Sequence, residues 1–350
     1  MKPVIAMTLA CAGLACANMA SAATPENCAP SGDLKFLCGP ESAEDLVRVG
    51  DSSWLIASGM AEAGHAGHLR LINTSDKTWS VIYPAGNAVA ALDARRFPNC
   101  PAAPDATKFS AHGITLRALG AGRHELLVVN HGGREAVEFF ELSTGSGKPA
   151  VRWIGCVPMA DDIYLNSVVP LRDGGFIATH FYSPSKGGIN AVFAREITGG
   201  IHEWHPGRAV TLIPGTELSG ANGLAVSQDE RVIHVAAWGT RDMVRFERQG
   251  NSVTKKVVPM TFAPDNVRWS QDGRSLLVAG QKFVPRAGGP ASLDGWSVIR
   301  VNPDTLATTM VRDADGSGPM QGITVAVEVA DEIWVGTFRG DRVGYFPRAR

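Results

Sequence analysis

Acidic, amide and imidazole side chains recur along this sequence, each at the start of a short apolar segment. The set comprises Glu44, His112, Asn166, Asn222, Asp265 and Asn266. All except His112 carry side-chain oxygen atoms, as carboxylates or as carboxamides. Such oxygens suit Ca²⁺, which takes about six to eight of them, with water completing the shell. One Asn or Asp in such a place often bonds to a turn, but five together predict a calcium site.

Two histidines flank one predicted hairpin and should reach the same end of it. His112 begins the outgoing strand, and His131 closes the returning strand in Val-Val-Asn-His. Two imidazoles in contact can act together, one as a base toward water and the other orienting it. Asp265, beside the predicted ion, is a rival candidate for base or nucleophile, and the residue types leave that choice open.

These residues belong to a repeated pattern of an apolar run, a tight turn and a second apolar run. The repeats begin near positions 44, 112, 166, 222, 266 and 322, so consecutive repeats are 44 to 68 residues apart. Turn signals such as Asp173-Gly174-Gly175 join the paired runs. This length and pairing predict an all-β, six-bladed β-propeller whose equivalent positions surround one central channel. We expect a single such domain over residues 23–350.

Three stretches of the predicted propeller should lack regular strands. Residues 23–43 read as an extended lead-in, and residues 84–111 and 282–295 are interrupted by proline and glycine. Loops of this kind on one face of a propeller often carry specificity elements.

Charge and motif content exclude several function classes. The 350 residues contain 33 Lys and Arg against 34 Asp and Glu, without a long run of either sign. This balance does not favour nucleic acid or an acidic membrane surface as a partner. The absence of a G-x-S-x-G motif disfavours a serine hydrolase. The sequence leaves the oligomeric state open.

The N-terminal residues predict export. A short basic start precedes an apolar run over residues 4–18 and the small-x-small motif Ala20-Ser21-Ala22. We predict a cleaved secretory signal peptide over residues 1–22 and a periplasmic or secreted protein. The apolar run is shorter than the ~20 residues of a membrane-spanning helix. A lipoprotein signal at Cys16 is disfavoured, because Gly13 stands where a larger aliphatic residue would be expected.

Four cysteines remain after the predicted cleavage, and an exported protein would be able to pair them. Three pairings are possible. We favour Cys28–Cys38 and Cys100–Cys156, because each cysteine lies in a segment flanked by proline or glycine. None has the CxxC spacing of zinc or redox sites.

Several motifs resemble one family. The run AHGITLR…ELLVVNHGGREAVEFFEL, with SAEDL, LNSVVPL, GANGLAVS, PDNVRWS and QGITVAV, resembles the paraoxonase/arylesterase branch of the gluconolactonase-type (senescence marker protein-like) propellers. The resemblance covers residues from about 44 to 346, in order. It implies a six-bladed propeller with a catalytic Ca²⁺ held by the five oxygen-bearing residues described above.

The resemblance also implies further site residues. A second, structural Ca²⁺ would be bound by Asp45 and the carbonyl of Ile114, although Ser167 replaces the acidic third ligand of the family pattern and puts that ion in doubt. Thr324, Lys282 and Phe338 would line the substrate pocket, with Lys282 in place of a family histidine. The cysteine that joins the chain ends in paraoxonases is missing.

Together these observations predict an exported, calcium-dependent hydrolase of lactones, with arylesterase activity as a side reaction. His112 is predicted to take a proton from water, His131 to orient His112, and Ca²⁺ to polarise the carbonyl of a small lactone or ester. One alternative is a gluconolactonase-like sugar lactonase with Asp265 as base. Another is a non-catalytic propeller that binds a ligand or partner and uses calcium for stability.

Overall fold

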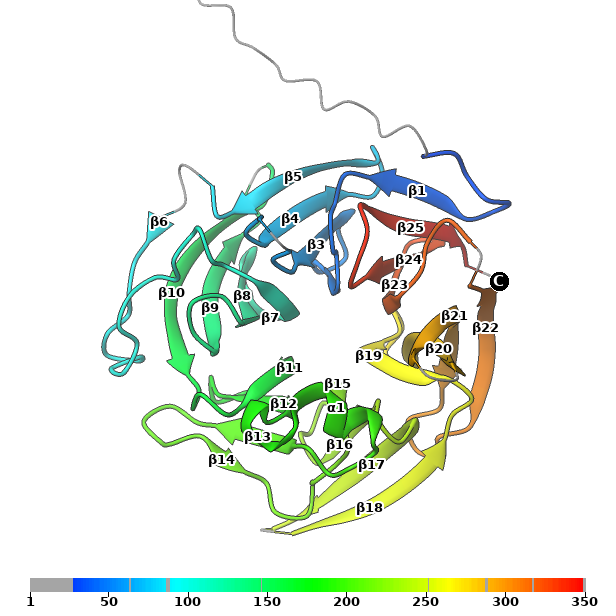
Figure 1. Ribbon diagram of the computed structural model, residues 1–350. Coiled ribbons are helices and arrows are strands. Elements are labelled where there is room, and N and C mark those ends of the chain that lie inside the picture. The colour runs from blue at the N-terminus through cyan, green and yellow to red at the C-terminus, as the bar shows by residue number, and fades with distance from the viewer. Residues whose placement is uncertain are drawn as a thin grey trace, which may run out of the picture.

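The computed structural model describes residues 28–62, 64–85, 89–145, 147–250, 252–286, 289–316 and 318–348. The predicted signal peptide lies outside these residues. Within them, the chain forms six antiparallel sheets arranged as blades around a central channel (Figure 1). The prediction of an all-β, six-bladed propeller is confirmed.

Each blade contains four principal strands, which are given below from the innermost to the outermost (Figure 1). The first blade contains β2 (Leu46–Arg48), β3 (Trp54–Gly59), β4 (His68–Asn73) and β5 (Thr78–Tyr83). The second contains β7 (Ala111–Gly120), β8 (Arg123–Asn130), β9 (Ala136–Ser143) and β10 (Ala150–Pro158), with the short β6 (Val89–Ala90) parallel to β10. The third contains β11 (Tyr164–Pro170), β12 (Phe176–Tyr182), β13 (Gly200–Trp204) and β14 (Thr211–Leu212).

The other three blades follow the same plan. The fourth contains β15 (Ala221–Val226), β16 (Val232–Ala237), β17 (Asp242–Gln249) and β18 (Ser252–Pro259). The fifth contains β19 (Ala263–Trp269), β20 (Leu276–Arg286), β21 (Gly289–Val301) and β22 (Thr308–Asp315). The sixth contains β23 (Ile323–Val329), β24 (Glu332–Thr337), β25 (Arg342–Pro347) and β1 (Lys35–Cys38).

The last blade closes the ring with strands from both ends of the described chain. Strand β1 pairs antiparallel with β25, from Lys35 opposite Tyr345 to Cys38 opposite Arg342. The expectation of a strand-free lead-in over residues 23–43 was therefore wrong for residues 35–38. Four residues are too short for a clear alternating pattern, and their partner lies at the other end of the sequence.

Both favoured disulfide pairings are confirmed. Cys28 is bonded to Cys38 beside the closing strand, and Cys100 is bonded to Cys156, which lies on β10. The second bond ties the long connection between the first two blades to the second blade.

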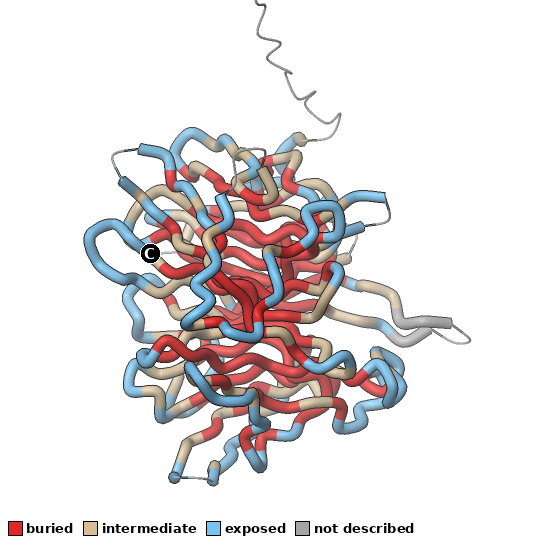
Figure 2. Tube along the Cα trace, turned by 90° about the vertical axis from the view of Figure 1, so that its left-hand side faces the viewer, coloured by how far each residue is buried: buried red, intermediate tan, exposed pale blue. Residues whose placement is uncertain are grey.

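The blades are held together by apolar side chains packed between neighbouring sheets. Figure 2 shows the strands buried through the middle of the molecule and the connecting loops exposed. Trp153, Trp296 and Trp334 are among the largest fully buried side chains. Burial of each such side chain contributes about 1.5–3 kcal/mol or more to the free energy of unfolding.

The two other predicted loops have different outcomes. In the described part of residues 84–111, the short β6 is the one strand before β7 begins. Residues 282–295, in contrast, largely belong to the long hairpin of β20 and β21, which corrects the prediction of an irregular stretch. The strand pairing shifts between Val284 and Arg286, so Pro285 lies at an irregularity where a ladder donor is not needed.

Among the residues that the structure describes, helical structure occurs in one place. The 3₁₀ turn η1 (Pro184–Lys186) and the short helix α1 (Gly188–Phe193) lie between β12 and β13. In the described part of the chain, the helices are too short and insufficiently apolar to cross a membrane.

Candidate functional site

The residues predicted to do chemistry lie at irregularities in the innermost strands. In four of these strands, the register with the next strand shifts across a pair of residues that includes at least one predicted site residue. These pairs are His112–Gly113 in β7, Asn166–Ser167 in β11, Asn222–Gly223 in β15 and Asp265–Asn266 in β19. A β-bulge interrupts the alternation of side chains and re-aims them. The repeated bulge therefore explains how residues far apart in sequence point into one channel.

Two of the bulges depend on glycine because neighbouring inner strands approach closely. A Cβ atom at Gly223 would lie 2.4 Å from the carbonyl oxygen of Asp265, and one at Gly113 would lie 2.2 Å from the carbonyl oxygen of Asn166. Any side chain there would push apart the strands that carry the site. The glycine in each of the motifs AHG and ANG thus has a packing role.

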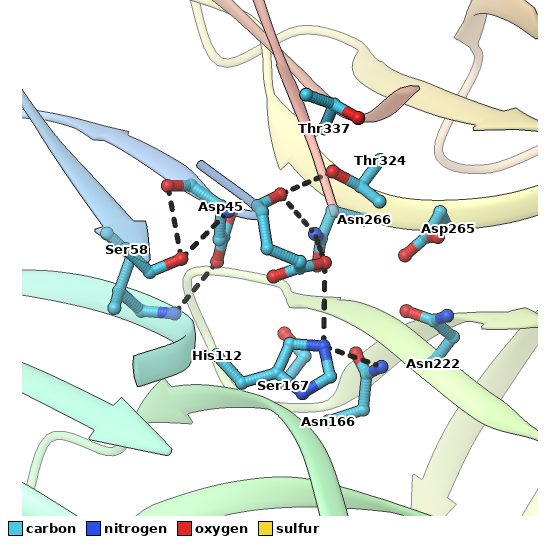
Figure 3. A network of polar contacts seen from close by, with 12 residues as sticks. Asp45, Ser58, His112, Asn166, Ser167, Asn222, Asp265, Asn266, Thr324 and Thr337 are labelled. Atoms are coloured by element: carbon cyan, nitrogen blue, oxygen red, sulfur yellow. Dashed lines mark hydrogen bonds and ion pairs between the residues drawn. The ribbon is translucent and has the colours of Figure 1, made fainter. Parts of the chain in front are cut away.

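The five residues predicted to bind calcium converge. Figure 3 shows Asn166, Asn222, Asp265 and Asn266 close together, and Glu44 joins them through its hydrogen bond with Asn266. Each is at most 5% exposed, and each has one side-chain oxygen without a hydrogen-bond donor among the described residues. These atoms are Glu44 Oε2, Asn166 Oδ1, Asn222 Oδ1, Asp265 Oδ1 and Asn266 Oδ1. A buried polar atom without a partner costs about 1–3 kcal/mol. Five at one place fit a bound cation with oxygen ligands.

The remaining polar atoms of these side chains orient the free oxygens. Asn266 Nδ2 donates to Glu44 Oε1 over 2.8 Å, and Gln281 Nε2 donates to Asp265 Oδ2 over 2.7 Å. Asn166 Nδ2 lies 3.3 Å from His112 Nε2. The described residues include no group of three or more His, Cys, Asp or Glu arranged to hold a metal ion, so the amide oxygens are needed to complete a ligand set here.

Burial dominates the electrostatics of the acidic residues. Burial, and then the charge of Glu44, raise the pKa of Asp265 well above its ordinary value of 3.8, although Gln281 donates to it. Burial also raises the pKa of Asp45 to about 6, against the opposing charge of Arg268. Without a compensating cation, the folded protein therefore resists ionising this pair.

The place predicted for a second calcium ion is taken by an arginine. Arg268 Nη2 pairs with the Asp45 carboxylate and donates to the carbonyl oxygen of Ile114 over 2.9 Å. Its Nε atom lies 3.3 Å from the carbonyl oxygen of Leu46. The two predicted ligands thus already contact one positive group, and their role as metal ligands stays a prediction. Ser167, the third position, is fully buried.

The two predicted histidines are in contact. His112 Nδ1 lies 2.7 Å from His131 Nε2, and the rings meet edge to face. His131 Nδ1 lies 2.7 Å from Glu135 Oε2. The flat face of His131 stacks on Tyr164, with ring centroids 3.9 Å apart. Sequence reasoning missed Glu135 and Tyr164, although an acid four residues after His131, across a Gly-Gly turn, was a usable signal.

The pKa values of the two histidines move in opposite directions. Burial lowers the pKa of His112, but the carboxylates of Glu44, Asp265 and Asp45 outweigh burial and raise it overall. Burial lowers the pKa of His131, and the Glu135 carboxylate only partly offsets this. At neutral pH His131 is therefore uncharged, and a cation that neutralises the surrounding carboxylates would also favour uncharged His112.

A cavity of about 440 Å³ borders these residues. Thr324 and Phe338 line it, as the resemblance implied, but Lys282 does not. Strand alternation at this place turns Gln281 toward the cavity and Lys282 away, and the Lys282 ammonium pairs with Asp313 over 2.6 Å. The structure thus corrects the placement of Lys282 in the pocket.

One side of the cavity is aromatic. We call it the aromatic wall, and it consists of Phe181, Phe193, Trp238 and Phe283. The Trp238 ring lies within 6.0 Å of the ring centroids of the other three. The indole N–H of Trp238 donates to Gln281 Oε1 over 2.8 Å, so the wall presents carbon to the cavity.

Comparisons with known proteins support the fold. No model of a protein family matches the chain, and no curated protein matches it in sequence. A gluconolactonase from Xanthomonas campestris has 16% identity, covers 90% of this chain and 89% of its own, and has a TM-score of 0.55. A luciferin-regenerating enzyme has 12% identity, covers 89% and 94%, and has a TM-score of 0.54. A putative gluconolactonase has 14% identity, covers 92% and 94%, and has a TM-score of 0.50. These likenesses show a shared six-bladed propeller.

Proposed function

We propose that this protein is an exported, calcium-dependent hydrolase of lactones, with arylesterase activity as a side reaction. The observation that carries the proposal is the group of five buried, unpartnered oxygens beside a histidine dyad and a cavity. Glu44, Asn166, Asn222, Asp265 and Asn266 would hold the ion. When bound, Ca²⁺ would polarise the carbonyl group of the substrate.

The protein's own residues supply the proton transfers in this mechanism. His112 Nε2 takes one proton from water, and the water oxygen forms a bond to the carbonyl carbon. The ring C–O bond then breaks, the proton passes to the departing alkoxide, and a hydroxy acid results. His131, through its 2.7 Å contact with Nδ1, keeps the His112 ring in place during both steps.

The lining of the cavity favours lactones with apolar substituents over sugar lactones. Hydroxyl groups need polar partners, but two of the polar side chains that line the cavity, Gln281 and Thr324, are already bonded within the protein. Gln281 bonds to Trp238, Asp265 and the carbonyl of Ile323, and Thr324 donates to the Glu44 carbonyl over 2.5 Å. A sugar hydroxyl that bonded to Gln281 or Thr324 would displace one of these contacts.

A sugar lactonase with Asp265 as base is the second candidate. It is supported by Asp265 Oδ1, which has no hydrogen-bond donor among the described residues.

Export is part of the first proposal and is supported by the two disulfide bonds, which are compatible with an oxidising compartment.

The decisive experiment measures hydrolysis of a lactone panel by the purified protein, with and without a calcium chelator. The panel should contain alkyl-substituted lactones, gluconolactone and phenyl acetate. We expect turnover of the alkyl lactones, loss of turnover in excess EGTA and recovery when Ca²⁺ is restored. Full activity in EGTA would exclude the calcium mechanism. Bound calcium without any turnover would instead support a ligand-binding propeller.

A further inference from the structure

Glu135 lies at the far end of the histidine pair from the predicted calcium site. It is in the connection between β8 and β9, next to β9, and its side chain is 12% exposed. Both of its carboxylate oxygens have a donor. Oε2 lies 2.7 Å from His131 Nδ1, and Oε1 accepts the backbone N–H of Leu165 over 2.7 Å. The acid therefore links the His131 ring to the start of β11.

The surroundings leave the His131 ring little freedom. One face stacks on Tyr164, which stacks in turn on Tyr182 with ring centroids 4.5 Å apart. The side chain is only 7% exposed. The hydrogen bond to Glu135 thus acts on a ring that is already held in one plane.

The carboxylate decides where the protons lie along the whole chain of contacts. A carboxylate only accepts hydrogen bonds, so His131 Nδ1 must carry the proton. In uncharged His131 the Nε2 atom is then an acceptor, and His112 must donate to it from Nδ1. His112 Nε2 is consequently left with its lone pair on the side of the cavity, where Glu44 Oε1 lies 3.6 Å away. The amide of Asn166, 3.3 Å away, faces that lone pair with its nitrogen.

We infer that Glu135 is a positioning residue that sets the tautomers of His131 and His112 and so makes His112 Nε2 a base. The inference rests on the proposed hydrolytic function for its catalytic meaning, but the tautomers themselves can be measured independently. Glu135 does not touch the cavity, so its effect passes through His131.

Replacing Glu135 by glutamine should reverse this order of protons. Glutamine offers one acceptor oxygen where the structure uses two. The Leu165 N–H is backbone and cannot change its role, so the amide oxygen is expected to turn toward it. The amide NH₂ then faces His131 Nδ1, which becomes an acceptor. Nε2 of His131 takes the proton, and His112 must carry its own proton on Nε2, where it can no longer act as a base.

The test combines ¹⁵N NMR of histidine-labelled protein with steady-state kinetics. In the calcium-loaded wild type, His131 Nδ1 should resonate as protonated and Nε2 as unprotonated, and E135Q should exchange the two. The same variant should lower kcat about 10²- to 10⁴-fold, the usual contribution of a positioned general base, with little change in KM or calcium affinity. E141Q is the matched control, because Glu141 lies on β9 and pairs with Arg152 away from the channel.

The outcomes separate the two hypotheses. If E135Q keeps the wild-type tautomer of His131, the role of Glu135 is overturned. It is also overturned if the His131 tautomer of E135Q is reversed but its kcat stays within about twofold of the wild-type value. If the wild type hydrolyses no lactone, the proposed function fails, and the NMR measurement still decides whether Glu135 sets the tautomers. Equal losses in E141Q would indicate a general effect on folding.

Discussion

At the scale of single residues, the site is organised by which polar atoms remain free. Asn266 and Gln281 each donate to one carboxylate oxygen and leave the other oxygen of that carboxylate buried without a donor. His131 likewise contacts Nδ1 of His112, so that Nε2 of His112 faces the cavity. The hydrogen bonds within the protein thus decide which oxygen and nitrogen atoms remain available for a cation or a proton. Because different residues carry these two kinds of atom, substitutions should separate cation binding from proton transfer.

His112→Gln tests that separation. The variant should retain calcium, because His112 does not contribute one of the five oxygens, but should hydrolyse lactones about 10²- to 10⁴-fold more slowly. Calorimetric calcium titration and kcat measurements check both parts. His124→Gln, on the same hairpin but away from the cavity, serves as the control. Near-native turnover in His112→Gln would make Asp265 the better candidate for the base.

The buried acids predict how the stability of the calcium-free protein depends on pH. The pKa of Asp265 is raised above its ordinary value of 3.8, so the folded state binds more protons than the unfolded state. The stabilisation is present below pH 3.8 and is lost as the pH rises through the folded pKa. Buried histidines act oppositely, since burial lowers the pKa of His202 to about 4.

The measurement must therefore compare the wild type with Asp265→Asn. In calcium-free buffer, urea unfolding from pH 4.5 to 7 should show the wild type losing stability relative to this variant as the pH rises. Saturating calcium should remove that difference or reverse it. A calcium-free difference that stays constant with pH would contradict the raised pKa of Asp265.

At the scale of elements, the innermost strands are joined by their polar start points as well as by apolar packing. Arg268 on β19 contacts Asp45 before β2 and the carbonyl of Ile114 on β7. One side chain thereby connects three blades across the channel. Its guanidinium is always charged, so this link does not depend on the supply of a free ion.

Arg268→Met should destabilise the protein by about 3–5 kcal/mol, because it leaves the fully buried Asp45 without its positive partner. Urea unfolding in saturating calcium gives the value. The control is Arg274→Met, an exposed residue in the turn that follows β19. A loss below about 1 kcal/mol would show that the contact behaves like a surface ion pair.

At the scale of the whole molecule, a ring closed between β1 and β25 surrounds a channel lined with unpartnered oxygens. A cation that binds only the folded ring stabilises it by mass action, by about 2.7 kcal/mol at a hundredfold excess over the Kd. We therefore expect Tm to fall on chelation and to rise again with added Ca²⁺. Asn222→Ala should weaken that calcium response. An identical Tm in excess EGTA and in calcium would contradict a cation site in the channel.

The sequence alone predicted the architecture and which polar residues converge in the channel. The six repeats predicted the propeller, because every blade must bury the same alternating faces. Their equivalent start positions predicted that Glu44, Asn166 and Asp265 would meet, because ring closure places equivalent positions at one end of one channel. The glycines of AHG and ANG also carried information, which their close backbone approaches now explain.

Only the tertiary structure decided which partners complete the site. Arg268 contacts both Asp45 and the carbonyl of Ile114, Glu135 extends the histidine pair, and Gln281 rather than Lys282 faces the cavity. These contacts join residues from different blades, or they depend on which of two successive strand residues faces the cavity. Periodicity cannot reveal them, because a bulge or a one-residue shift reverses the direction of a side chain while leaving the sequence pattern almost unchanged.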